Sequence, residues 1–114
     1  MSAPEAPSEL ARRHGDLVVA DIRAVSDAPF SLDDDAMGGV SVFLESEERD
    51  PETGLFSCVY VTLHNRGASL LVMDSCAPGS RVRVVDFDVE DASARVAAVR
   101  LALEFVGRPT RGAP

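Results

Sequence analysis

The segment that most constrains this fold is 88–109, DVEDASARVAAVRLALEFVGRP, which carries the one long helical pattern in the chain. Apolar residues recur in it at steps of three and four, the spacing that places side chains on one face of a helix. They are Val89, Ala92, Val96, Val99, Leu103 and Val106. A helix with one apolar stripe has to bury that stripe against a second layer of the structure.

The residues at both ends of this segment predict where the helix begins and ends. Asp88 is a candidate N-cap, since its carboxylate can accept hydrogen bonds from the free amides of the first turn. Asp91 stands three residues further on, where a capping box has its second acidic residue. Gly107 and Pro109 are typical of a helix C-terminus.

Upstream of the helix, short runs of β-forming residues alternate with turn signals. The predicted strands are 17–25, 40–45, 56–64, 70–74 and 81–87. Segment 70–74, LLVMD, is apolar on both faces, so we expect it to be central and covered. The connections are mostly short, as at Asn65-Arg66-Gly67, and short connections favour antiparallel pairing. Segment 26–39 is predicted to be a loop, and 9–14 at most one helical turn.

The predicted fold is therefore α+β, an antiparallel sheet of about five strands covered on one face by a long C-terminal helix. The length of 114 residues predicts a single domain. We place it at 10–110, between disordered tails at 1–9 and 111–114, because residues 2–8 are rich in Pro, Ala and Ser.

Charge and composition narrow the class of function. The formal net charge is −8, which disfavours a nucleic-acid-binding protein and suits a partner with a basic surface, or solubility alone. All eleven basic residues are arginine, a bias typical of a GC-rich bacterial genome. The N-terminus, MSAPEAPSEL, lacks the basic and apolar regions of a signal peptide, and no apolar run approaches a membrane span. We therefore expect a cytoplasmic protein.

The residue types that usually carry catalysis or bind metals are few and scattered. Cys58 and His64 share one side of a predicted strand but stand roughly 20 Å apart, too far for a nucleophile and its base. Either Cys76 or Ser75 could stand opposite Cys58 on the neighbouring strand. The choice depends on the strand register, which the turn does not fix. Both thiols are interpreted as structural and reduced. We expect no catalytic site, no metal and no cofactor, and no enzymatic activity.

Two acidic groups are the candidate partner-binding residues, because they are the densest charges predicted to be exposed and recognition often uses loops. The candidates are Asp33, Asp34, Asp35, Glu45, Glu47 and Glu48. The three aspartates do not form a calcium loop, since Met37 and Leu44 stand where such a loop has ligands. A solvated loop without a partner is the alternative interpretation of this run.

Several segments resemble immunity protein family one of bacterial polymorphic toxin systems. They are VSVFLE, the hairpin CVYVTLHNRGASLLVMD, the helix DVEDASARVAAVRLALEF and the turn VGRP, and the resemblance spans 40–110. The family follows this turn with a short strand that carries a Trp, whereas this chain has TRGAP and no Trp. The resemblance implies an inhibitor without catalysis that binds a cognate toxin, often a nucleic-acid deaminase, and occludes its active site.

A secretion-chaperone-like protein that binds a partner polypeptide is the alternative function. Such proteins are acidic, combine an antiparallel sheet with helices and usually dimerise, but they need a helix before the sheet. The sequence predicts only a stub there, at 9–14. A toxin gene or a secretion gene beside this one would favour the first or the second function, respectively.

Overall fold

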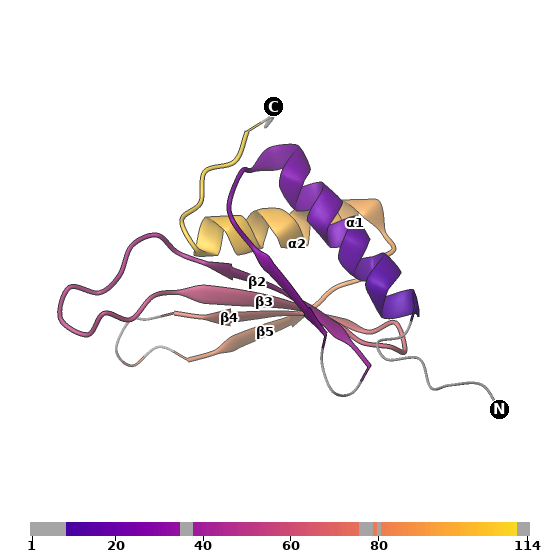
Figure 1. Ribbon diagram of the computed structural model, residues 1–114, viewed down its shortest axis with the longest axis horizontal. Helices are drawn as coiled ribbons and strands as arrows, with labels where there is room; N and C mark the ends of the chain where they lie inside the picture. The colour runs from indigo at the N-terminus through magenta and orange to yellow at the C-terminus, as the bar shows by residue number, and fades with distance from the viewer. Residues whose placement is uncertain (1–8, 35–37, 76–78, 80, 112–114) are drawn as a thin grey trace.

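A computed structural model describes residues 9–34, 38–75, 79 and 81–111. These residues form a five-stranded antiparallel sheet in which each strand pairs with its neighbours along the chain, and both helices lie on one face of it (Figure 1). The elements are α1 (Glu9–Val25), β1 (Ser31–Asp34), β2 (Val40–Glu45), β3 (Cys58–Leu63), β4 (Ser69–Asp74), β5 (Arg83–Asp86) and α2 (Ala92–Phe105). The α+β class, the five-stranded antiparallel sheet and the packing of a C-terminal helix against it are confirmed.

The first predicted strand, 17–25, is wrong, because this segment is the second half of α1. Helix α1 has 17 residues, three more than α2, and the predicted turn at 9–14 is its beginning. Its buried residues follow one another at steps of one, three and four, which is the spacing of a helical face. They are Ala11, His14, Gly15, Val18 and Ile22.

The strand that replaces it in the sheet is β1, which lies inside the predicted loop 26–39. Strand β1 pairs antiparallel with β2, and Leu32 stands opposite Val42. All four of its residues are exposed, so β1 adds an edge to the sheet but little buried apolar area.

The central strands lie where the sequence predicts them. Val59, Val61 and Leu63 of β3 are buried under the helices, as the alternation predicts. Strand β4 is central, between β3 and β5. It is covered on one face only, because Leu71 and Met73 are buried whereas Leu70 and Val72 are half-buried.

Helix α2 begins later than predicted. Its N-cap is Asp91, whose Oδ1 accepts a hydrogen bond from the backbone N–H of Ser93 at 3.0 Å. Asp88, the predicted cap, accepts instead from the N–H of Glu90 in the preceding turn, also at 3.0 Å. Two Asp residues three apart compete for this role, and the later one is the N-cap because residues 88–91 form a turn of their own, in which the N–H of Asp91 donates to the carbonyl of Asp88 at 3.2 Å.

The predicted C-terminus of α2 is confirmed. Gly107 has φ +69°, a backbone conformation that glycine adopts without strain. Its N–H donates to the carbonyl of Glu104 at 3.0 Å, and the N–H of Arg108 donates to the carbonyl of Leu103 at 2.9 Å. This pair of hydrogen bonds is a Schellman motif, which satisfies the last carbonyls of the helix.

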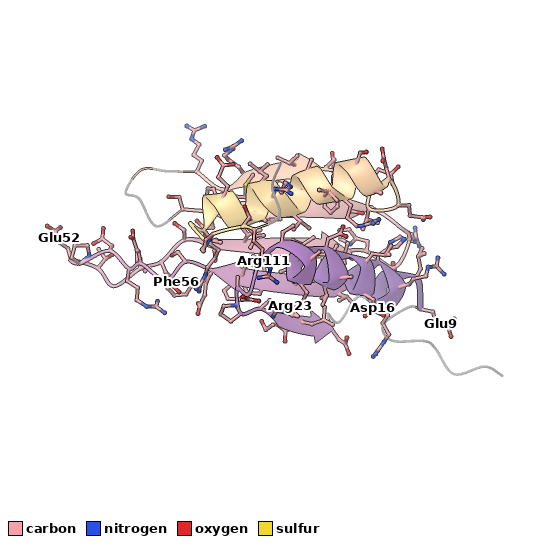
Figure 2. All side chains as sticks on the ribbon, turned by 90° about the horizontal axis from the view of Figure 1, so that it is seen from above. Glu9, Asp16, Arg23, Glu52, Phe56 and Arg111 are labelled. Carbon is pink, nitrogen blue, oxygen red and sulfur yellow. The ribbon has the colours of Figure 1, made fainter. Side chains whose placement is uncertain are left out.

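The buried face of α2 is turned relative to the prediction. Val99 and Leu103 are buried as predicted, and so are Val89 and Val106 just outside the helix, but Val96 is 38% exposed and Ala92 lies in the exposed first turn. Their places in the core are taken by Ala98 and Ala102. The helix also lies beside α1, so it has two neighbours to contact and not the sheet alone. Figure 2 shows the two helices side by side above the strands.

None of the helices in the described part of the chain is both long and apolar enough to cross a membrane.

Candidate partner-binding surface

The candidate acidic residues lie at the two ends of β2. Asp33 and Asp34 of β1 stand opposite Ser41 and Val40, at the beginning of β2, and Glu45 is its last residue. Asp35 lies outside the described residues. Four residues separate Ser41 from Glu45, which is about 13 Å along a strand. The structure therefore does not gather the predicted residues into one cluster.

The two aspartates of β1 also point to opposite faces of the sheet, because neighbouring residues of a strand alternate. Asp34 lies on the helix side, where Arg12 Nη2 is 3.5 Å from its carboxylate. Asp33 lies on the side away from the helices, which we call the open face. Glu45 shares the open face with Asp33, since both are on the side opposite to the buried Val40, Val42 and Leu44 of β2.

Glu47 and Glu48 follow β2 in the connection to β3. Arg108 Nη1 donates to Glu47 at 2.7 Å, and Arg108 Nε donates to the carbonyl of Glu45 at 3.0 Å. Glu47 is therefore held by the segment that follows α2. Glu48 is exposed and, like Asp33 and Glu45, makes no ion pair with any described residue.

The connection between β2 and β3 projects from the sheet as an arm, with Glu52 near its far end (Figure 2). The Asp50 carboxylate accepts from the N–H groups of Thr53 at 2.9 Å and Glu52 at 2.8 Å, which orders the tip. These backbone hydrogen bonds lower the pKa of Asp50. Further back, the Arg49 guanidinium lies 4.4 Å from the centre of the Phe56 ring.

Intramolecular contacts occupy six of the eleven arginines. Four make ion pairs and two lie over aromatic rings, so less positive charge is left to face a partner. The contacts are Arg12–Asp34, Arg95–Asp21, Arg108–Glu47, Arg111–Asp27, Arg23–Phe30 and Arg49–Phe56.

An apolar row crosses the open face at its middle. Phe43, Tyr60, Val72 and Val84 stand opposite one another on β2, β3, β4 and β5. The Phe43 and Tyr60 rings are 5.0 Å apart, and Tyr60 and Val84 are 42% and 58% exposed. The sequence shows these residues alternating with the core, but it does not show that the second face of the sheet stays uncovered.

Acidic residues border this row on both sides. Along the strands, Asp33 and Asp86 lie on one side of it, and Glu45 and Asp74 on the other. Every charged strand residue on the open face is acidic, because the one arginine within a strand, Arg83, has the other orientation, opposite the buried Met73.

Cys58 lies on the open face between Glu45 and Asp74, which are its partners on the two neighbouring strands. The register therefore pairs Cys58 with Asp74, neither of the two arrangements considered from the sequence, and Cys76 lies outside the described residues. Partial burial raises the pKa of the Cys58 thiol, and the negative charges of Asp74 and Glu45 raise it further. A thiol that stays protonated is a poor nucleophile.

We expect Asp74→Asn to make Cys58 more reactive, because removing a negative neighbour lowers the thiol pKa and increases the thiolate fraction. The measurement is the rate of iodoacetamide alkylation at mildly alkaline pH, with Cys76→Ser as the background in all three proteins compared. Asp88→Asn, which changes an aspartate outside the sheet, is the control. Equal rates in all three proteins would show that Asp74 does not control the thiol.

His14 is the one completely buried histidine, on the inner face of α1. Its Nε2 is 3.2 Å from Glu90 Oε2, while its Nδ1 has no hydrogen-bond partner within the described structure. The described residues contain no group of three or more His, Cys, Asp or Glu that could hold a metal ion. The sequence has no signal that separates a buried His14 from an exposed one.

Comparisons with protein-family models, with curated proteins and with solved structures found no match to this chain.

Proposed function

We propose that this protein is a non-catalytic, cytoplasmic binding protein that neutralises a bacterial toxin domain by covering its active site. The observation that carries the proposal is the sign of the free surface charge. Six arginines are engaged within the molecule, while the charged strand residues of the open face are all acidic. The partner that fits such a surface is a basic one.

A toxin that acts on nucleic acid is the basic partner that suits this charge. Its substrate site must attract phosphates, so it carries arginine and lysine around the reacting groups. An acidic protein that binds there competes directly with the substrate and needs no chemistry of its own. The resemblance to immunity protein family one supports the same class of partner.

Co-expression with the protein encoded by the neighbouring gene tests this function. We expect the neighbour to stop growth when it is expressed alone, and growth to recover when this chain is expressed with it. A neighbour that is harmless, or one that is toxic and is neither bound nor neutralised, would contradict the proposal.

The salt dependence of association gives a second, quantitative prediction. Surface charges are screened over about 8–10 Å near physiological ionic strength, so the association rate with the neighbour should fall as salt rises. The double variant Asp33→Asn, Glu45→Gln should lower the association rate more than it raises the dissociation rate. Glu104→Gln, which neutralises one exposed acid on α2 away from the open face, is the control and should change neither rate.

One finding favours the second candidate, a secretion-chaperone-like protein. The helix that such proteins need before the sheet is present as the 17-residue α1, although the sequence predicts only a stub. This function predicts a dimer that binds an unfolded segment of a secreted protein encoded nearby. Sedimentation together with binding of that segment, in place of rescue from a toxin, would make it the better explanation.

A further inference from the structure

We infer that the open face of the sheet is the docking surface, and that it binds a protein surface whose apolar centre is bordered by arginine or lysine. This inference rests on the proposed function in one respect, that the protein binds a partner. It adds which face of the protein contacts the partner and which kind of partner surface that face binds.

The apolar centre of this docking surface is the row Phe43, Tyr60, Val72 and Val84. Both helices cover the other face, so nothing in the described structure packs over this one (Figure 1). An antiparallel sheet with one solvated face usually has polar residues there. Here the middle of that face is aromatic and aliphatic across four neighbouring strands. Exposed tyrosine beside other apolar side chains is typical of protein interfaces.

Four acidic residues form the charged border of the docking surface, around the apolar row. Asp86 on one side and Glu45 and Asp74 on the other are each two residues from the row along their own strands, about 7 Å, and Asp33 is two residues from Ser31, which stands opposite Phe43. Carboxylates at this distance sit at the border of an apolar contact, where they can pair with basic side chains of a partner while staying close to water. Such rim pairs select a basic partner and speed its association.

The arrangement of charge also decides against other occupants. A second copy of this chain would bring the same four acids against each other, because a two-fold interface joins identical patches. Like charges placed together disfavour that contact. Nucleic acid and anionic lipid surfaces are repelled for the same reason. A basic protein surface is the occupant that meets both the apolar row and its acidic border.

A hollow beside the row extends the surface at the β1 edge of the sheet. It has a volume of about 270 Å³ and is lined by Pro29, Phe30, Ser31, Phe43 and Glu45. Arg23 already lies over the Phe30 ring, but the Phe43 ring with a carboxylate beside it suits a long basic side chain, since its apolar stem can lie on that ring while its charged end pairs with Glu45. We expect a partner arginine or lysine to bind here.

A synthetic peptide of alternating leucine and arginine is the probe for this surface. We titrate it into the isotopically labelled full chain and map the amide shift changes by NMR. The expected result is binding, with the largest shifts on the open-face strand residues. A matched peptide of alternating leucine and glutamate should not bind, because the apolar content is the same and only the charge is reversed.

Two matched substitutions sharpen the experiment. Val84→Ser, on the open face, should weaken the binding of the leucine–arginine peptide about fivefold, as expected for losing part of one buried valine contact. Val96→Ser makes the same change at an exposed valine of α2, on the other layer, and should leave the affinity unchanged. Shifts confined to the helices, equal binding of both peptides, or no binding would each overturn the inference. A dimer that Val84→Ser dissociates would also overturn it, because a second copy would then be the occupant.

Co-expression separates failure of the docking surface from failure of the proposed function. If the neighbouring protein is toxic, Val84→Asp should abolish rescue and Val96→Asp should preserve it. Rescue by both variants would leave the toxin-neutralising function standing and remove the open face as its surface. If the neighbour is harmless, the proposed function fails, and the peptide titration still decides whether the open face binds basic, apolar protein surfaces.

Discussion

Leu103→Ala is expected to lower the free energy of unfolding by about 2–5 kcal/mol, the range for truncating a large side chain in a core. Leu103 is completely buried in α2, in the same core as Val61 and Leu71 of the sheet. Domains of this size have roughly 5–15 kcal/mol of stability in total, so the variant should lose a large part of it. The measurement is the denaturant midpoint from chemical unfolding followed by circular dichroism.

Val96→Ala is the control for this prediction, because it truncates a residue of the same predicted stripe, seven positions before Leu103, that the structure leaves partly exposed. Val96 is 38% exposed, so its loss should change stability by no more than about 0.5 kcal/mol. If the two variants lowered the midpoint equally, the orientation of α2 would be wrong, and the stripe predicted from the sequence would describe the helix better.

The sequence predicts this fold best where the apolar pattern is regular and only one partner layer is involved. Strand β3 alternates clearly, and β2 and β4 are short runs of β-forming residues. Turn residues separate the three strands, so their positions follow from local rules. The end of α2 is equally local, since Gly107 followed by Pro109 is a signal that needs no tertiary contact.

The first helix shows why the prediction fails elsewhere. Its buried face contains His14 and Gly15, which an apolar pattern does not count, so the helical spacing of Ala11, Val18 and Ile22 is interrupted. The remaining run LVVADIRAV then has the composition of a strand. Gly15 lies close to the sheet, because a Cβ there would be 3.2 Å from Val40 Cγ1, so that any larger residue would have to displace Val40 by a few tenths of an ångström. A tertiary contact of this kind cannot be inferred from the neighbouring sequence.

The candidate surface was only partly predictable for a similar reason. Charge density in the sequence identifies Asp33 and Glu45, which both lie on the open face. It does not identify Asp74 and Asp86, which are isolated acids in apolar strands. The apolar row is visible as alternation, but Tyr60 and its neighbours become a surface only because both helices lie on the other face. The sequence predicts that one helix covers one face of the sheet, but it does not predict which of the two faces is covered.

A second large loss of stability is expected when the contact between the two helices is broken. Arg95 of α2 pairs with Asp21 of α1 through its Nε, and its Nη1 donates to the carbonyl of Val89 at 2.8 Å. The two side chains are only 12% and 20% exposed. Arg95→Ala would leave the Asp21 carboxylate and a backbone carbonyl largely buried without this donor. We expect it to lower the free energy of unfolding by about 3 kcal/mol, near the lower limit for breaking a buried pair.

The pair Arg12–Asp34 provides the comparison, since it also connects α1 to another element but is 60% and 58% exposed. Double-mutant cycles on both pairs, with each residue replaced by Ala, separate the pairwise interaction from the loss of the single side chains. We expect a coupling energy of about 0.2–1 kcal/mol for the exposed pair, decreasing with salt, because water and ions screen it. The coupling of Arg95 with Asp21 should be larger and nearly independent of salt, since burial excludes the screening ions. Equal couplings with equal salt dependence would mean that the helix contact is hydrated and that burial does not strengthen this ion pair.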